Sequence, residues 1–95
     1  MQSYTPWSRT AVLKSLTARA GRQLVLLRYA ADHNPDTEWV YNGADIDRAR
    51  VVWARDMGVQ RNAELLRYFS DRTCWLLEPD ATPLRLSRCV EDRLP

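Results

Sequence analysis

The residues best suited to catalysis or metal binding lie between positions 32 and 47, where acidic side chains occur near the only histidine. His33 is followed by Asp36 and Glu38, and a histidine beside carboxylates suits a hydrolase or a metal site. A transition-metal site, however, needs three or four converging ligands, and the chain has neither a second histidine nor an HExxH spacing. In the alternative interpretation, the Asp and Asn side chains of this stretch form Asx turns. The spacing of these residues therefore favours Asx turns over a hydrolase or metal site.

Two further carboxylates, Asp45 and Asp47, are separated by one residue. Their side chains share one side of the chain only if the segment is extended. If residues 44–47 instead form a single helical turn, one of the two carboxylates caps that turn. We retain both, together with His33, as candidate binding residues.

Aromatic side chains are a second source of binding chemistry, because their rings stack on sugars and bases. Trp39 and Tyr41 follow the polar stretch and are the best candidates for an exposed aromatic platform that binds a ligand or partner. Trp53 and Trp75 lie within aliphatic runs, which predicts that they belong to the core. Core packing is also the alternative interpretation of Trp39 and Tyr41.

The number and spacing of the glycines exclude a glycine-rich phosphate loop. The chain has only Gly21, Gly43 and Gly58, which cannot form a GxGxxG or P-loop pattern. The turn at 56–59 does lie between an expected strand and an expected helix, where open α/β sheets bind ligands. Because Asp56 would repel a phosphate there, we interpret the turn as a plain connection.

The two cysteines lie on the two strands of an expected hairpin. If the hairpin turns at Ala81 and Thr82, pairing Asp80 with Pro83 places Cys74 directly opposite Cys89. Directly opposed Cα atoms are about 4.5 or 5.5 Å apart, which is within the range of a disulfide. Such a bond would form in an extracytoplasmic domain, whereas a cytosolic one would keep the thiols reduced. The alternative is a pair of small buried side chains without a bond.

The composition indicates one α/β domain over residues 1–95. Apolar residues make up 45% of the 95 residues, and 14 basic side chains against 12 acidic ones give a net charge of +2. This balance excludes a polybasic nucleic-acid tail, so we expect no nucleic-acid partner. All basic residues but Lys14 are arginines, and their scatter among acids favours a codon bias over a one-sided anion-binding face. No apolar run approaches the about 20 residues of a spanning helix, and we expect no signal peptide.

Hydrophobic periodicity predicts two helices and at least three strands. The first helix is capped by Thr5, with Pro6 in its first turn, and ends at Ala20 before Gly21. The other elements follow as strands over 23–29 and 50–56, a helix over 60–69, and strands over 73–78 and 84–90. A short β-prone segment at 39–41 lies in the long loop between the first two strands.

This order predicts a small two-layer α/β domain with a three- to four-stranded mixed sheet, two main helices and a C-terminal β-hairpin. The strand–helix–strand unit over 51–77 should be a right-handed parallel crossover. The long loop between the first two strands is unusual in a compact domain, and such loops are often functional.

Several strings together resemble a known group of proteins. They are Glu38-Trp39-Val40-Tyr41-Asn42, Val51-Val52-Trp53-Ala54-Arg55-Asp56-Met57-Gly58 and Trp75-Leu76-Leu77-Glu78-Pro79-Asp80. The stretch from about Gln23 to Leu86 resembles the extreme C-terminal region of large bacterial polytopic membrane proteins of the dolichyl-phosphate-mannose protein mannosyltransferase type, or of uncharacterised membrane proteins. In that superfamily the catalytic acid lies in an early extracytoplasmic loop of the membrane domain, which no part of this chain matches. The resemblance therefore carries no catalytic residue onto this chain.

The resemblance implies a non-catalytic accessory domain on the extracytoplasmic face of a bacterial membrane. Its partners would be the membrane domain of the parent protein and a lipid-linked sugar, with no cofactor and no metal. An independent module that binds a small anion or sugar at the C-terminal edge of the sheet is the second hypothesis. A small hydrolase that uses His33 with Asp36 or Glu38 is the third.

Overall fold

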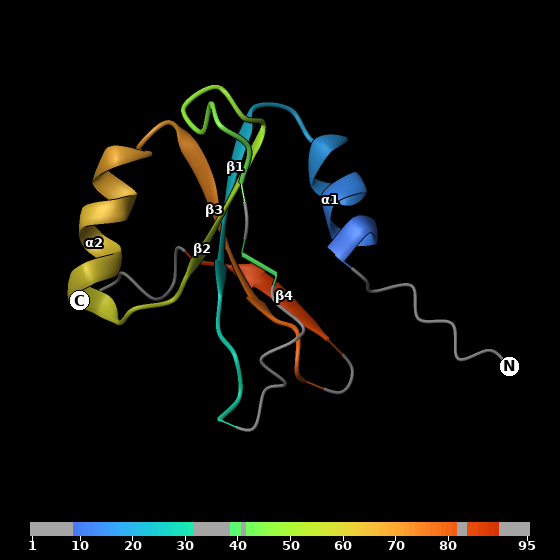
Figure 1. The fold of residues 1–95 in the computed structure, drawn as a ribbon, viewed down its shortest axis with the longest axis vertical. Helices are drawn as coiled ribbons and strands as arrows, with labels where there is room; N and C mark the ends of the chain where they lie inside the picture. Colours follow the sequence, from blue (N-terminus) through green and yellow to red (C-terminus); the bar gives the residue numbers. More distant parts are fainter. Residues whose placement is uncertain (1–8, 32–38, 41, 82–83, 90–95) are drawn as a thin grey trace, which may run out of the picture.

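The apolar run at 24–27 forms the centre of a four-stranded mixed sheet. The computed structural model describes residues 9–31, 39–40, 42–81 and 84–89. Strand β1 (Arg22–Leu27) lies between β2 (Val51–Arg55) and β3 (Arg72–Glu78) and is parallel to both. Strand β4 (Arg85–Arg88) pairs antiparallel with β3, so the strand order is β2-β1-β3-β4 (Figure 1). The central position of β1 explains its continuous apolar sequence, because both of its faces are covered.

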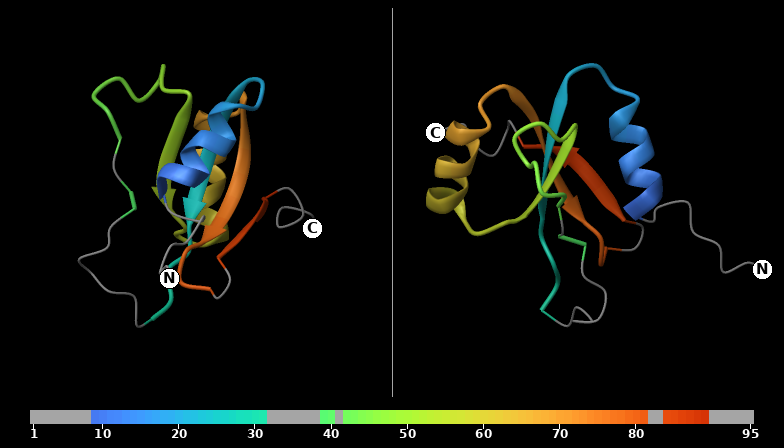
Figure 2. Two further views of the ribbon diagram at one scale, coloured as in Figure 1. Left: turned by 90° about the vertical axis from the view of Figure 1, so that its right-hand side faces the viewer. Right: turned by 45° about the horizontal axis from the view of Figure 1, so that its top comes forward.

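The two helices cover opposite faces of this sheet. Val25 and Leu27 of β1 pack with helix α1 (Arg9–Thr17), whereas Leu24 and Leu26 belong to the cluster that α2 (Val59–Tyr68) covers. In the left view of Figure 2, α1 lies in front of the strands and α2 behind them. The α/β class, the mixed sheet and the hairpin are confirmed. The layering differs from the two layers expected, because alternate residues of β1 give each face enough apolar surface to bury a helix.

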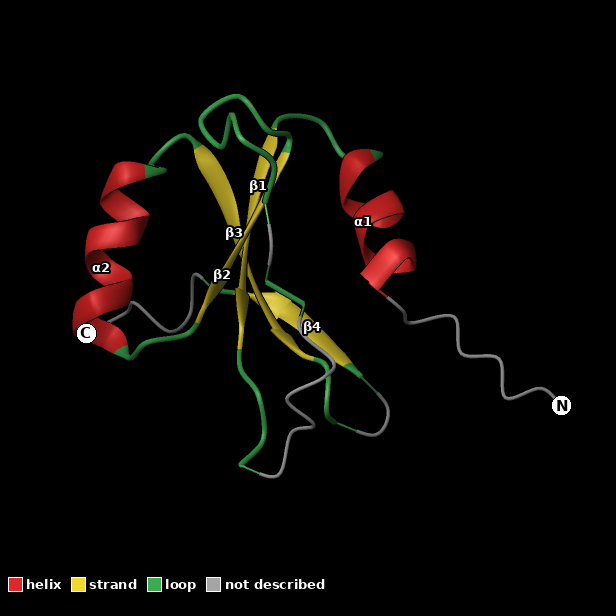
Figure 3. Cartoon of the chain, viewed as in Figure 1, coloured by secondary structure: helices red, strands yellow, loops and turns green. Residues whose placement is uncertain are grey.

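The connections that leave β1 and β2 run to different faces. After β1 the chain returns through Trp39, which belongs to the core cluster beneath α1. After β2 the chain enters α2, on the other face. The described parts of the first connection are loop and turn, and the β-prone residues 39–40 belong to no strand (Figure 3). The connections that follow two neighbouring parallel strands thus leave the sheet toward opposite faces. The carboxyl edge at such a point is where α/β sheets bind ligands.

The hairpin has the register that the turn residues predicted. Trp75 pairs with Arg88 and Glu78 pairs with Arg85. One step beyond the ladder, the Cys89 N–H donates to the Cys74 carbonyl at 3.0 Å, and the two side chains form a disulfide with a Cα–Cα distance of 5.3 Å.

The remaining described boundaries differ from those expected by at most three residues. Helix α1 ends at Thr17 rather than Ala20, and Gly21 adopts a φ of 82° in the turn that follows. The expected cap of this helix at Thr5 and Pro6 lies outside the described residues.

Arg72 fastens the long connection to the sheet. Its side chain is buried at the start of β3, and its guanidinium donates to the carbonyls of Ala49 at 2.7 Å and Asp47 at 3.0 Å. A third bond, of 3.2 Å, reaches the Gln23 carbonyl in β1. One arginine thereby ties the chain before β2 to the two neighbouring strands.

Candidate functional site

A groove lies between α2 and the sheet, at the edge where the parallel strands end. Its volume is about 470 Å³. Its walls are largely apolar and include Leu26, Leu66 and Leu76 from the sheet and α2. At its mouth stand Arg28 and Asp56, the residues that directly follow β1 and β2. Because the connections that follow β1 and β2 run to opposite faces, they leave this edge of the sheet uncovered.

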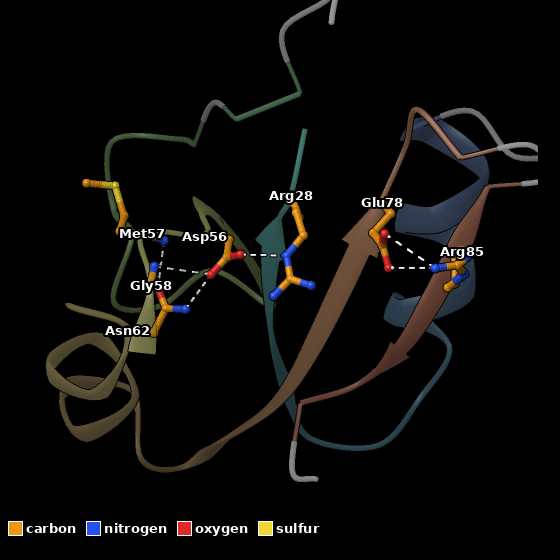
Figure 4. Close-up of polar contacts among 7 residues, drawn as sticks. All are labelled: Arg28, Asp56, Met57, Gly58, Asn62, Glu78 and Arg85. Atoms are coloured by element: carbon orange, nitrogen blue, oxygen red, sulfur yellow. Dashed lines mark hydrogen bonds and ion pairs between the residues drawn. The ribbon is translucent and has the colours of Figure 1, made fainter. Parts of the chain in front are cut away.

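Arg28 and Asp56 form an ion pair across the two strand ends (Figure 4). Arg28 Nε donates to Asp56 Oδ2 at 2.7 Å, and the Asp56 side chain is only 13% exposed. Backbone bonds hold both residues, because Arg28 N–H donates to Leu77 and Asp56 N–H donates to Leu27, each at 2.9 Å. The pair therefore has a geometry set by the sheet rather than by a loop.

Asn62, in the first turn of α2, completes this network. Its Nδ2 donates to Asp56 Oδ1 at 2.6 Å, and its Oδ1 accepts from the Met57 N–H at 3.0 Å. The same Asp56 oxygen accepts from Gly58 N–H at 3.4 Å, and Gly58 adopts a φ of 94° that favours glycine. Figure 4 shows Asp56 between Arg28 and Asn62. The turn at 56–59 is therefore a rigid corner.

These contacts set the ionisation of Asp56. Partial burial alone would raise the pKa of this carboxyl, but the hydrogen bonds from Arg28, Asn62 and Gly58 and the charge of Arg28 outweigh it, so its pKa lies below the ordinary 3.8. Asp56 is consequently a carboxylate at neutral pH and acts as a hydrogen-bond acceptor. Its charge also balances that of Arg28, so it does not leave the mouth of the groove acidic.

The groove combines this polar mouth with apolar walls, a combination that suits binding. Ala63 has a small side chain on the α2 wall, and the exposed Arg67, near the end of α2, and Ser70, just after it, also line the groove. Among the residues that the structure describes, no group of three or more His, Cys, Asp or Glu side chains is placed to hold a metal ion.

Trp39 lies in the core, which corrects its assignment to an exposed platform. It is only 9% exposed, and its ring centroid is 6.4 Å from that of Trp53. Its N–H donates to the Tyr29 hydroxyl and its carbonyl accepts from Arg9 Nε, both at 2.9 Å. The polar sequence before Trp39 suggested exposure, but the apolar surface beneath α1 buries the ring.

Asp45 and Asp47, the other predicted site residues that the structure describes, do not line the groove. Asp45 and Asp47 precede β2 and so lie at the opposite edge of the sheet, where the strands begin. Asp45 is exposed and pairs with Arg48 at 3.6 Å, and Asp47 Oδ1 accepts from the Tyr68 hydroxyl at 2.7 Å. Both fall in a segment of turns over 45–49, as the helical-turn interpretation expected. His33 and Tyr41 lie outside the described residues, as do Asp36 and Glu38.

Arg28, Asp56 and Asn62 were absent from the predicted site. The signal that could have found Arg28 and Asp56 is positional, because each directly follows a parallel strand. Asp56 was set aside as a charge that repels anions, and only the structure brings Arg28 to within hydrogen-bonding distance of it.

Comparisons with protein-family models, with curated proteins and with solved structures find no match for this chain. Within the described ranges, neither helix has the length and apolarity needed to cross a bilayer.

Proposed function

We propose that this chain is a non-catalytic accessory domain of a membrane glycosyltransferase-like protein and that it acts by binding. The groove carries this proposal, because apolar walls and a preorganised polar mouth occur at the edge where α/β sheets hold ligands. The Asp56 carboxylate accepts three hydrogen bonds and is ionised, so it serves as a fixed support for Arg28. The parent protein is inferred from the sequence resemblance alone.

An extracytoplasmic position is part of the same proposal. The Cys74–Cys89 disulfide supports it, since such bonds persist mainly in oxidising compartments. The partners would be the membrane domain of the parent protein and a lipid-linked sugar whose apolar part enters the groove.

The reading frame that encodes Met1 tests the accessory role. Several hydrophobic spans encoded upstream in the same frame would support it. A stop codon directly before Met1 would favour the second candidate, an independent small-ligand module, for which the position of the groove is the supporting observation.

Binding in the groove is tested by titrating the chain with decanoate and with decyl glucoside while following amide resonances. We expect saturable shifts at Asn62 and Leu66, which line the groove. Ala63→Trp should fill the groove and abolish the shifts, whereas Gln60→Trp, on an exposed position of α2, should leave them intact. If neither amphiphile shifts these resonances, the groove is not a binding site.

Catalysis is tested with an activated sugar donor. We expect no turnover by the chain alone. Turnover that His33→Ala abolishes would establish the hydrolase hypothesis instead.

A further inference from the structure

Arginines that are far apart in the sequence meet at the edge opposite the groove. Arg22 and Arg72 are the first residues of β1 and β3 and are partners in the sheet register. Arg50 directly precedes β2, Arg88 ends the antiparallel β4, and Arg19 lies in the turn before β1. Parallel strands begin at a common edge and an antiparallel neighbour ends there, so the topology gathers these residues. Their scatter in the sequence had suggested no one-sided cationic surface.

Three of these arginines are engaged in holding the fold. Arg72 binds backbone carbonyls, as described above. Arg50 Nη2 donates to the carbonyls of Thr17 and Arg19 at 3.2 and 2.9 Å. Arg22 donates to the Asp47 carbonyl at 3.2 Å and lies 3.6 Å from the Asp71 carboxylate.

Arg19 and Arg88 differ, because both guanidinium groups make cation–π contacts with one buried indole. The Cζ atoms of Arg19 and Arg88 lie 4.6 and 5.4 Å from the centroid of the Trp75 ring. In the described part of the chain, neither guanidinium has a hydrogen-bond or ion-pair partner. A cation–π contact does not use the N–H donors of a guanidinium as hydrogen bonds, so these donors stay available to a ligand.

The indole that carries them is itself held in place. Trp75 Nε1 donates to the side-chain oxygen of Gln23 at 2.8 Å, and both residues are buried. Gln23 Nε2 in turn donates to the Ala20 carbonyl at 3.2 Å. The two cations therefore rest on a fixed support.

A hollow of about 350 Å³ opens beside these cations. Arg19, Arg88, Thr73 and Trp75 line it, and none of its described lining residues is acidic. A smaller hollow of about 280 Å³ shares Thr73 and Arg88 and is also lined by Arg72. The Arg72 Nε is buried and has no hydrogen-bond partner among the described residues. Neither hollow has an acidic residue among its described lining, whereas the carboxylates of Asp47 and Asp71 lie elsewhere at this edge.

We propose that Arg19, Arg88 and Thr73 form a binding site for a phosphate group. Two guanidinium forks match the charge of a phosphate dianion, and its oxygens accept several charge-assisted hydrogen bonds at once. The hydroxyl of Thr73, two residues before Trp75, is on the same face of β3 and adds a neutral donor. This site is separate from the groove, so it stands or falls independently of the proposed function. The phosphate belongs either to a free solute or to a lipid headgroup.

The test uses the full chain, inorganic phosphate and two kinds of vesicle. Phosphate should shift the Trp75 indole N–H resonance saturably, with a midpoint of about 1 mM or below, which corresponds to a few charge-assisted bonds. Sedimentation with phosphatidylcholine vesicles, with and without phosphatidic acid, reports headgroup binding. Binding of phosphate alone identifies a free solute as the source, and binding of only the acidic vesicles identifies a headgroup. Either result supports the site, and the absence of both overturns it.

The variant Arg19→Gln/Arg88→Gln should weaken binding at least about tenfold. The matched control Lys14→Gln/Arg61→Gln removes the same net charge from exposed positions on the two helices and should change binding less than about twofold. Arg19→Lys/Arg88→Lys keeps the charge and loses the planar guanidinium groups, so it should bind phosphate with intermediate strength. If the Gln variant does not fold, the Lys variant provides the test in its place. Equal weakening in the Gln variant and the control would show nonspecific attraction and overturn the site.

Discussion

The side-chain amide of Asn42 takes the place of a neighbouring strand beside Trp53. Asn42 Nδ2 donates to the Trp53 carbonyl, and the Trp53 N–H donates to Asn42 Oδ1, both at 2.9 Å. Strand β2 is at the edge of the sheet, so these backbone groups have no strand to pair with on that side. One amide thereby satisfies both backbone groups of a core residue and blocks part of an exposed edge.

Asn42→Ala should lower the free energy of unfolding by about 1–2 kcal/mol, because two hydrogen bonds to the backbone are lost. Asn42→Asp keeps the acceptor and loses the donor, so its loss should be smaller. Urea unfolding measures both. Asp45→Ala is the control, since its ion pair with Arg48 is exposed and should contribute less than about 0.5 kcal/mol. A loss for Asn42→Ala no larger than that of the control would contradict the role of the amide.

The Asp56 network should make stability depend on pH in the acid range. Because the folded-state pKa of Asp56 lies below its ordinary value of 3.8, folding favours the carboxylate. The resulting stabilisation is complete above that ordinary value and is lost as the pH falls below it, through the lower folded-state pKa. Asp56→Asn should flatten the dependence in this range, as urea midpoints between neutral and acid pH would show. If the stability of Asp56→Asn depends on acid pH as strongly as that of the unaltered chain, this assignment is refuted.

Trp39 should matter as much for folding as Trp53. Both rings are buried in the cluster beneath α1, so Trp39→Ala and Trp53→Ala should each cost about 3–5 kcal/mol of unfolding free energy. Met57→Ala, at a side chain that is 52% exposed, should change stability by less than about 0.5 kcal/mol. If Trp39→Ala resembles Met57→Ala, the ring is not part of the core and the platform interpretation returns.

The disulfide should stabilise the folded chain by linking the two strands of the hairpin. It closes a short stretch of chain, with a sequence separation of 15, for which the loop-entropy relation gives about 3 kcal/mol. Cys74→Ser/Cys89→Ser should therefore lower the free energy of unfolding by roughly that amount. Thiol titration of the unfolded chain, made under oxidising conditions, should find free thiols only after a reductant is added. Two free thiols without reductant would remove the support for an extracytoplasmic position.

Local patterns were sufficient to predict the elements of this fold. Continuous apolar runs predicted buried strands, and the spacing of Leu65, Leu66 and Phe69 predicted a helix that covers one face. The turn residues around Ala81 set the register that places Cys74 near Cys89. These features depend on neighbours in the sequence, for which periodicity and turn preferences are informative.

The layering and the burial of Trp39 depended on tertiary structure. A polar flank made Trp39 look exposed, yet the sheet offers an apolar face that its ring covers with Val12 and Leu16. Local polarity cannot report how much apolar surface a distant strand presents, and burying that surface outweighs the local preference.

The sequence by itself determined the α/β class, the order of helices and strands, and the hairpin register, because these follow from residues close together in the chain. Only the tertiary structure decided which charges meet. Arg28 and Asp56, 28 positions apart, become an ion pair because parallel strands end side by side. Arg19 and Arg88 come to share the ring of Trp75 because β1, β3 and β4 place their ends at one edge. Charge pairing acts through space over a few ångströms, and strand order sets those distances.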